Sequence, residues 1–121
     1  MGNPFVHIEL NTQDAGAAKT FYGQLFDWTL TDVPMGDGVV YTMINVGEGT
    51  GGGLWQSPVP NVPSFWLAYV GVADIHAATA RARDLGATVM REPMEVMGMG
   101  WLSIIVDPTG AHLGLWQPNP R

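Results

Sequence analysis

Apolar and polar residues alternate along residues 5–10. One side of this run carries Val6, Ile8 and Leu10, and the other side carries Phe5, His7 and Glu9. A period of two residues predicts a β-strand with one apolar face and one mixed face. After Asp14 the apolar positions adopt helical spacing, at Ala18, Phe21, Tyr22 and Leu25. Because Asp is a preferred N-cap residue, the pattern predicts a helix that begins directly after Asp14.

Three β-rich runs follow this predicted helix, at about residues 28–30, 39–46 and 51–56. Asp37-Gly38 is a turn signal between the first two of them. The first half of the chain is therefore predicted to have the order β-α-β-β-β.

The second half repeats this order. A strand is expected over residues 65–72, followed by a helix that Asp74 caps and Gly86 ends. The residues expected to face inward from this helix are Ile75, Ala78, Ala82 and Leu85. Further strands are expected near residues 87–90, 101–106 and 111–117, with a hairpin turn at Asp107-Pro108-Thr109-Gly110.

An internal repeat relates the two halves. Gly53-Leu54-Trp55-Gln56 recurs as Gly114-Leu115-Trp116-Gln117, an offset of 114 − 53 = 61 residues. The two capping aspartates are 60 residues apart. The sequence thus predicts one domain, residues 1–121, made of two modules at about 1–60 and 61–121. The Pro-rich segment 57–63 joins them.

Composition narrows the class of protein. The 121 residues are 46% hydrophobic and 13% charged, which is typical of a folded chain. A net charge of −6 with only five cationic residues argues against binding to nucleic acid. No apolar run is long enough to span a bilayer, so no membrane partner is expected. With no cysteine and no signal-peptide pattern, we expect a cytoplasmic protein.

Several short motifs, in this order, resemble the vicinal-oxygen-chelate superfamily of glyoxalases, bleomycin-resistance proteins and extradiol dioxygenases. They are His7, Phe21-Tyr22, Leu85-Gly86-Ala87 and Asp107-Pro108-Thr109-Gly110. The resemblance covers essentially the whole chain. It implies an α+β fold in which two tandem βαβββ modules form curled mixed sheets around a concave cavity. It also implies a homodimer.

Alternation along the strands predicts which side chains face that cavity. If Val6, Ile8 and Leu10 pack on the helix, His7 and Glu9 point the other way. The remaining residues expected on the cavity face are Phe5, Gly53, Trp55, Phe65, Leu67, Tyr69, Trp101, Ser103, His112, Gly114 and Trp116. Glycines on this face are interpreted as relieving bulk and leaving room for a ligand.

The resemblance also implies metal ligands on the first and last strand of each module. The corresponding residues are His7, Gly53, Leu67 and Gly114, with Phe65 in place of Leu67 if the alignment slips by two. Only His7 is a metal ligand by type, so the usual metal site is expected to be absent and no cofactor is predicted. A relocated site made of His7, Glu9 and His112 remains open, with Fe, Mn, Ni or Zn as the metal. His76 is expected to face solvent.

The leading functional hypothesis is a glyoxalase-like protein that binds a small apolar or aromatic molecule without the usual metal. The ligand-binding residues would be Trp55, Tyr69, Trp101, His112 and Trp116. The alternative is a lyase, isomerase or dioxygenase-type enzyme. In it His7 would act as general base with Glu9 as its partner, and His112 would join them with or without a divalent metal. A third possibility is an accessory domain with a filled interior.

Overall fold

The computed structural model describes residues 2–119, and the chain divides into two compact units. The first unit is His7–Leu67. The second unit combines the described residues before His7 with those from Ala68 onward. Each unit contains one helix and one set of hydrogen-bonded strands, and each is described by itself below.

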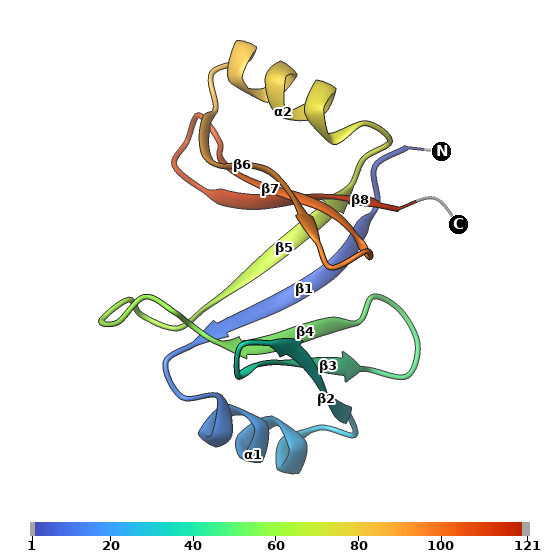
Figure 1. The fold of residues 1–121 in the computed structure, drawn as a ribbon, viewed down its shortest axis with the longest axis vertical. Helices are drawn as coiled ribbons and strands as arrows, with labels where there is room; N and C mark the ends of the chain where they lie inside the picture. The colour runs from blue at the N-terminus through green and yellow to red at the C-terminus, as the bar shows by residue number, and fades with distance from the viewer. Residues whose placement is uncertain (1, 120–121) are drawn as a thin grey trace. The chain divides into compact units, whose positions relative to one another are not determined.

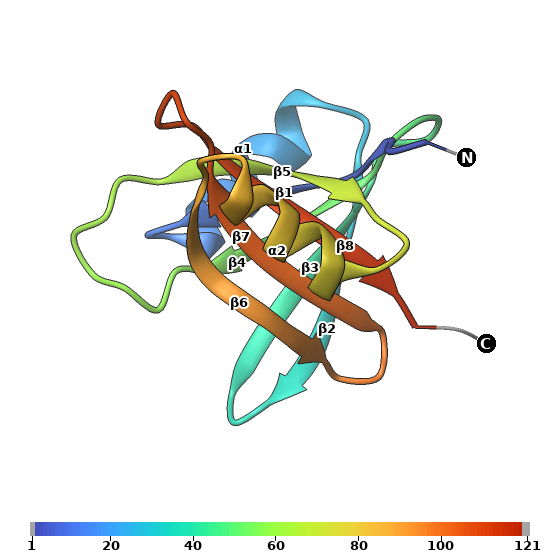
Figure 2. The same ribbon diagram turned by 90° about the horizontal axis from the view of Figure 1, so that it is seen from above.

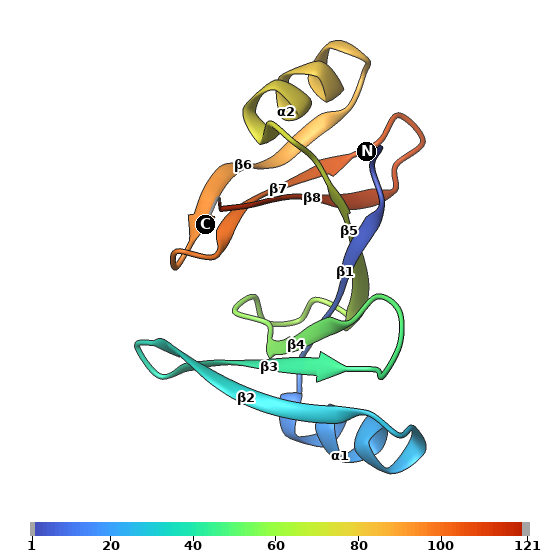
Figure 3. The same ribbon diagram turned by 90° about the vertical axis from the view of Figure 1, so that its right-hand side faces the viewer.

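In the first unit the strands lie in the order β2-β3-β4-β1. Their bounds are β1 (Phe5–Thr12), β2 (Thr29–Gly36), β3 (Val39–Asn45) and β4 (Gly52–Gln56), with α1 at Ala15–Leu25. β1 and β4 are parallel, whereas β2, β3 and β4 run antiparallel to their neighbours. Helix α1 covers one face of these strands (Figures 1 and 3).

The second unit has the same arrangement, with the strand order β5-β8-β7-β6. Its elements are β5 (Phe65–Gly71), α2 (Ile75–Asp84), β6 (Thr88–Val96), β7 (Gly100–Val106) and β8 (His112–Pro118). β5 and β8 are parallel, and β6, β7 and β8 are antiparallel. Helix α2 lies over this sheet (Figure 2). The predicted α+β class, with β-α-β-β-β twice and mixed sheets, is confirmed.

The internal repeat has a structural reason at the start of each helix. The Asp14 and Asp74 carboxylates accept hydrogen bonds from the amides of Ala17 and Ala77, at 3.0 and 3.1 Å. In addition, the glutamine that ends each repeat motif caps the helix of its own unit. Gln56 Oε1 accepts from the Ala15 amide at 2.9 Å, and Gln117 Oε1 accepts from the Ile75 amide at 2.8 Å. Two of the four unpaired amides of each helix are satisfied in this way.

The core of the first unit is apolar. Leu10, Ile44 and Leu54 are buried together. The side chains packed around them are Ala15, Ala18, Tyr22, Trp28, Leu30 and Val46. Contrary to the sequence interpretation, Phe21 and Leu25 are exposed, at 57% and 56%. The α1 side chains that pack on the core are Ala15, Ala18 and Tyr22.

The second unit joins its helix to its sheet through hydroxyl groups. Thr79 and Ser103 are both buried, and their hydroxyls are 2.9 Å apart. Ile75 is completely buried as predicted, whereas Leu85 is 63% exposed, because α2 ends one residue earlier. The other buried residue of α2 is Thr79, one turn after Ile75.

The boundary between the compact units differs from the sequential boundary expected near residue 60. The first residues of the chain belong with the second unit: the Gly71 amide donates to the Pro4 carbonyl at 2.8 Å, and Asn3 donates to the Gly71 carbonyl at 2.9 Å. β1 therefore begins in one unit and continues into the other.

The outermost strand is β2 in the first unit and β6 in the second. Each is longer than predicted and carries a proline. The pairing of β2 with β3 shifts between Pro34 and Gly36, next to the predicted Asp37-Gly38 turn. The pairing of β6 with β7 shifts between Arg91 and Met94, around Pro93. Both edge strands are thus irregular where the proline stands.

Candidate functional site

The first strand presents three polar side chains on the face opposite α1. Leu10 is buried against the helix, so His7, Glu9 and Asn11 point to the other face by alternation. This places His7 and Glu9 where the sequence predicted them relative to the helix. The same face carries Tyr41 from β3 and Trp55 from β4, which are cross-strand partners.

These five side chains form one chain of hydrogen bonds. His7 Nε2 is 2.7 Å from the Tyr41 hydroxyl, which donates to Glu9 Oε2 at 2.9 Å. Asn11 Nδ2 donates to Glu9 Oε1 at 3.2 Å, and Trp55 Nε1 donates to Asn11 Oδ1 at 2.6 Å. The pair His7–Glu9 considered from the sequence is therefore bridged by a phenol.

Tyr41 and Asn11 were missed by the sequence interpretation. Asn11 has the same parity as His7 and Glu9, so extending the first strand by one residue would have included it. Tyr41 is 34 residues from His7, and only the hairpin register places it across the sheet. The feature that could have identified Tyr41 is the hairpin register, which follows from the Asp37-Gly38 turn and the pairing of Tyr41 with Trp55.

Gly53 has a role different from the one expected. A methyl group at Gly53 would overlap the phenol ring of Tyr41. The space above this glycine therefore holds an aromatic ring, and the absence of a side chain at Gly53 leaves room for Tyr41 to reach His7. The glycine makes room for a protein side chain at this point of the face.

Burial lowers the pKa of His7 from its ordinary value of 6.5. The cause is desolvation, which disfavours the charged imidazolium. At pH 7 the ring is therefore neutral, with one nitrogen protonated and the other carrying a lone pair. A neutral imidazole can accept a proton or bind a metal, so either function is chemically accessible.

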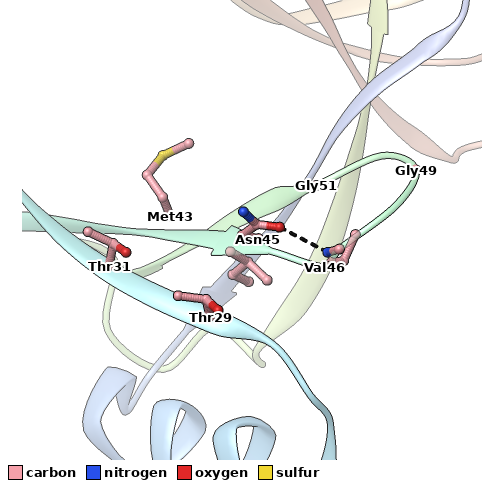
Figure 4. Close-up of a pocket in the computed structure, with 9 residues that line it drawn as sticks. Thr29, Thr31, Met43, Asn45, Val46, Gly49 and Gly51 are labelled. Atoms are coloured by element: carbon pink, nitrogen blue, oxygen red, sulfur yellow. Dashed lines mark hydrogen bonds between the residues drawn. The ribbon is translucent and has the colours of Figure 1, made fainter.

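A shallow hollow of about 380 Å³ opens on the same face, between β2, β3 and the loop before β4 (Figure 4). Met43, Thr31 and Asn45 stand around it, and they share the face of Tyr41 by strand parity and register. The remaining lining residues are Thr29, Ile44, Val46, Gly47, Gly49 and Gly51. None of the nine carries a charge.

The hollow borders the strand that carries His7. The Gly51 carbonyl accepts from the amide of Ile8, the residue after His7, at 3.1 Å. The loop wall is fixed by a hydrogen bond from the Gly47 amide to Asn45 Oδ1 at 2.9 Å, drawn in Figure 4. Gly47 has φ +97°, a conformation that suits glycine. The hollow thus lies beside the strand that carries His7, and we treat the hollow and the hydrogen-bonded chain as neighbouring parts of the candidate site.

The second unit places its predicted residues differently. Tyr69 is 4% exposed and its ring lies over Gly114, where a methyl group would overlap it. Trp116 in turn fills the space above Gly100. These residues share the face opposite α2, as expected. His112 begins β8 and is exposed.

Trp101 and Ser103 lie on the opposite face from the one predicted. The Trp101 ring meets His76 of α2 edge to face, with centroids 5.4 Å apart. Ser103 bonds to Thr79 of the same helix. Trp101 is therefore a helix-facing residue, and His76, though exposed, packs against it.

Neither unit contains three His, Asp or Glu side chains gathered as a metal site among residues 2–119. His7 and Glu9 belong to the first unit and His112 to the second. Among these described residues, no helix is long and apolar enough to span a membrane.

Comparison with known proteins agrees with the fold. The model of the Glyoxalase/Bleomycin resistance protein/Dioxygenase superfamily matches residues 5–115. "Putative glyoxylase CFP32" of Mycobacterium tuberculosis is 37% identical over 119 residues, covering 93% of this chain and 44% of the relative. The anthracycline biosynthesis protein DnrV of Streptomyces peucetius is 29% identical over 124 residues, covering 91% and 45%. The chain thus spans under half the length of these relatives.

Solved structures share the fold at low identity. Methylmalonyl-CoA epimerase from Mycobacterium tuberculosis has a TM-score of 0.73 and 17% identity, covering 96% of this chain and 88% of that one. A hypothetical protein from Bacillus halodurans has a TM-score of 0.74 and 15% identity, covering 100% and 98%.

Proposed function

Because the chain belongs to the Glyoxalase/Bleomycin resistance protein/Dioxygenase superfamily, we propose that it binds a small organic molecule on the face of the first unit opposite α1. The observation that carries this proposal is the uncharged hollow beside the chain His7–Tyr41–Glu9. Its volume of about 380 Å³ falls within the usual range for small-molecule sites.

The lining indicates the ligand chemistry. Threonine and asparagine side chains offer hydrogen bonds, Met43 offers a polarisable apolar contact, and no lining residue offers a counter-ion. A charged ligand group would find no oppositely charged side chain in this lining. We therefore expect an uncharged molecule with an apolar or aromatic body. Since a relative is named for anthracycline biosynthesis, an anthracycline belongs among the compounds to test.

The experiment is a binding titration followed in amide ¹H–¹⁵N spectra, using acetophenone, benzoate and an anthracycline as probes. We expect acetophenone to shift Met43, Asn45 and Gly51, and the charged benzoate to bind at least tenfold more weakly. Thr31→Trp should fill the hollow and abolish the shifts. Thr88→Trp, on the exposed edge strand β6, is the matched control. Shifts confined to residues outside the hollow would contradict the proposal.

The proposed binding function does not use the metal site of the family. Of the four corresponding positions only His7 is a ligand by type. The space at Gly53 is taken by Tyr41, that at Gly114 by Tyr69, and Leu67 is buried. These residues do not fit a three-ligand metal site. Elemental analysis after incubation with Fe²⁺, Mn²⁺, Ni²⁺ or Zn²⁺ tests this: one metal per chain, lost in His7→Ala, would contradict it.

A second candidate function is proton transfer at His7. It is favoured by the bridge from a neutral imidazole through Tyr41 to the Glu9 carboxylate, an arrangement that suits a general base. The lyase, isomerase and dioxygenase-type alternatives belong here. Turnover should then fall as the pH drops through the lowered pKa of His7. If His7→Gln retained turnover of a substrate that binds in the hollow, this function would be excluded.

We also propose that the chain acts as a cytoplasmic homodimer, as family members often do. Sedimentation equilibrium of the purified chain tests the dimer directly, with a mass near twice 13.0 kDa as the expected result. A single species at 13.0 kDa over the micromolar range would contradict it.

A further inference from the structure

The loop beside the hollow fixes the direction of one amide side chain in the lining. A backbone N–H can donate a hydrogen bond but cannot accept one. The Gly47 amide nitrogen is 2.9 Å from Asn45 Oδ1, so the side-chain oxygen of Asn45 must face the loop. The side-chain nitrogen of Asn45 then turns away from the loop, and in Figure 4 it lies on the side of Met43.

This nitrogen is a hydrogen-bond donor that the described part of the chain leaves to solvent. Asn45 is exposed at the end of β3, and within residues 2–119 its hydrogen bond is the one that its oxygen accepts from Gly47. Because an amide NH₂ group carries two hydrogens and accepts none, the only group that can pair with it is an acceptor. In the free protein that acceptor is water.

The two threonines of the lining impose no such requirement. Thr29 is the cross-strand partner of Asn45, and Thr31 is the partner of Met43. A hydroxyl can turn to donate or to accept, so both threonines adapt to either kind of ligand group. Among the side chains that line the hollow, Asn45 is therefore the one whose hydrogen-bond direction is set in advance.

Met43 defines where the apolar part of a ligand would lie. It is two residues before Asn45 on β3 and lines the same hollow, so the two side chains are separated by about 7 Å along the strand. One end of the hollow thus offers a donor, and the other offers a polarisable thioether. A molecule with an oxygen acceptor at one end of a short apolar body matches both.

We propose that Asn45 is the specificity-determining residue of the hollow, and that it selects uncharged ligands which present a carbonyl or similar acceptor oxygen to Asn45 Nδ2. The apolar body of the ligand lies over Met43. A ligand group that can only donate a hydrogen bond is rejected, because it would meet another donor. The inference rests on the proposed binding function and names the ligand class for the same site.

Asn45→Asp provides the sharpest test, because it keeps the shape of the side chain. One carboxylate oxygen still accepts from the Gly47 amide, while the other replaces the donor with an acceptor. Acetophenone can only accept a hydrogen bond, whereas the hydroxyl of 1-phenylethanol can donate or accept. We expect the ratio of the two affinities, acetophenone over 1-phenylethanol, to fall by about tenfold or more in Asn45→Asp.

The affinities are measured from amide ¹H–¹⁵N shifts of Met43 and Gly51, so that only binding in the hollow is counted. In the wild type, acetophenone should also move the side-chain NH₂ signals of Asn45. The matched control is Asn61→Asp, which adds the same charge at an exposed residue outside the hollow. It should leave the ratio unchanged.

A second measurement tests the direction of the amide without any ligand. Asn45→Leu removes the acceptor of the Gly47 amide, so exchange of that amide proton with water should accelerate by about tenfold. In Asn45→Asp the acceptor remains and the exchange should stay slow. Equal exchange of the Gly47 proton in the wild type and Asn45→Leu would overturn the inference.

The titrations separate this inference from the binding function on which it rests. If both probes bound in the hollow and Asn45→Asp left their ratio unchanged, the role given to Asn45 would be wrong and the binding function would stand. If neither probe shifted a residue of the hollow in the wild type, the binding function and the inference would fail together.

Discussion

The two units share an architecture but differ in the chemistry of the sheet face opposite the helix. The first unit packs helix on sheet through an apolar cluster and carries hydrogen-bonded polar side chains on the other face. The second unit buries a hydroxyl pair between helix and sheet, and its other face carries Tyr69, Leu102, Ile104 and Trp116. Both keep the helix-capping glutamine and the glycine beneath an aromatic ring. The two units therefore share the residues that build the fold and differ in the chemistry of the faces opposite the helices.

The largest expected difference between the units concerns the glycines under the aromatic rings. Gly114→Ala would overlap the ring of Tyr69, which is 4% exposed. We expect a loss of about 2–3 kcal/mol in the free energy of unfolding. Gly53→Ala should cost only about 1 kcal/mol, because Tyr41 is less buried and can turn away. Urea denaturation measures both.

The control for this pair is Gly23→Ala in α1, where the nearest atom would be 3.8 Å away. It should stabilise the protein by about 0.5–1 kcal/mol, since alanine is the better helix former. Equal losses for Gly53→Ala and Gly114→Ala would show that the two rings are equally constrained, and would remove this part of the comparison.

A second prediction concerns the hydroxyls between helix and sheet. Thr79→Val removes the partner of the Ser103 hydroxyl, which is completely buried, so we expect a loss of about 2 kcal/mol. Thr42→Val in the first unit should cost less than about 1 kcal/mol, because its partner Asp32 is exposed and water can replace the bond.

Two further measurements refine this second prediction. Thr79→Val combined with Ser103→Ala should recover part of the loss, because no buried hydroxyl is then left without a partner. In Thr42→Val the pKa of Asp32, which the Thr42 hydroxyl and Lys19 lower, should rise towards its ordinary value. Carbon chemical shifts across an acid titration record that change. An unmoved Asp32 pKa would contradict the role given to Thr42.

The smallest expected effect is the pH dependence contributed by His7. Its pKa is lowered in the folded state, so the unfolded chain binds the proton more readily. The stability from the neutral ring is complete above pH 6.5 and is lost as the pH falls towards the folded pKa. The slope contributed by one group cannot exceed about 1.4 kcal/mol per pH unit.

Unfolding free energies at pH 7.5, 6.0 and 5.0 measure this slope. His7→Gln should flatten the dependence in that window, whereas His76→Gln, in the second unit, should leave it unchanged. The lowered pKa of Asp32 also reduces the free energy of unfolding as the pH falls. This effect begins only below the ordinary value of 3.8, outside this window. An identical slope in His7→Gln would mean that the environment of His7 does not disfavour its charge.

The sequence predicted the parts of the fold that local patterns determine. Alternation located β1, the aspartates located both helix starts, and the repeat gave the order of strands twice. It failed at Trp101 and Ser103, because every residue from 101 to 106 except Ser103 is apolar, and such a run does not reveal which side faces the helix. Phe21 and Leu25 were misplaced because helical spacing alone does not give the width of the buried stripe.

The candidate site was predictable only in part. His7 and Glu9 followed from strand parity, but Tyr41 reaches them across the sheet from a distant part of the sequence. The hollow depends on how β2, β3 and the loop after Asn45 bend, which residue types do not specify. Gly53 was interpreted as leaving room for a ligand, whereas the ring of Tyr41 occupies that space.

The prolines in β2 and β6 bear on how the protein behaves at high concentration. A regular edge strand offers a row of amides and carbonyls on which another chain can add as a further strand, and fibrils grow by repeating that step. Pro34 and Pro93 each remove a donor, and the shifted pairing beside them distorts the row. Another chain therefore cannot readily pair with β2 or β6. We expect these two edges not to start fibrillar aggregation.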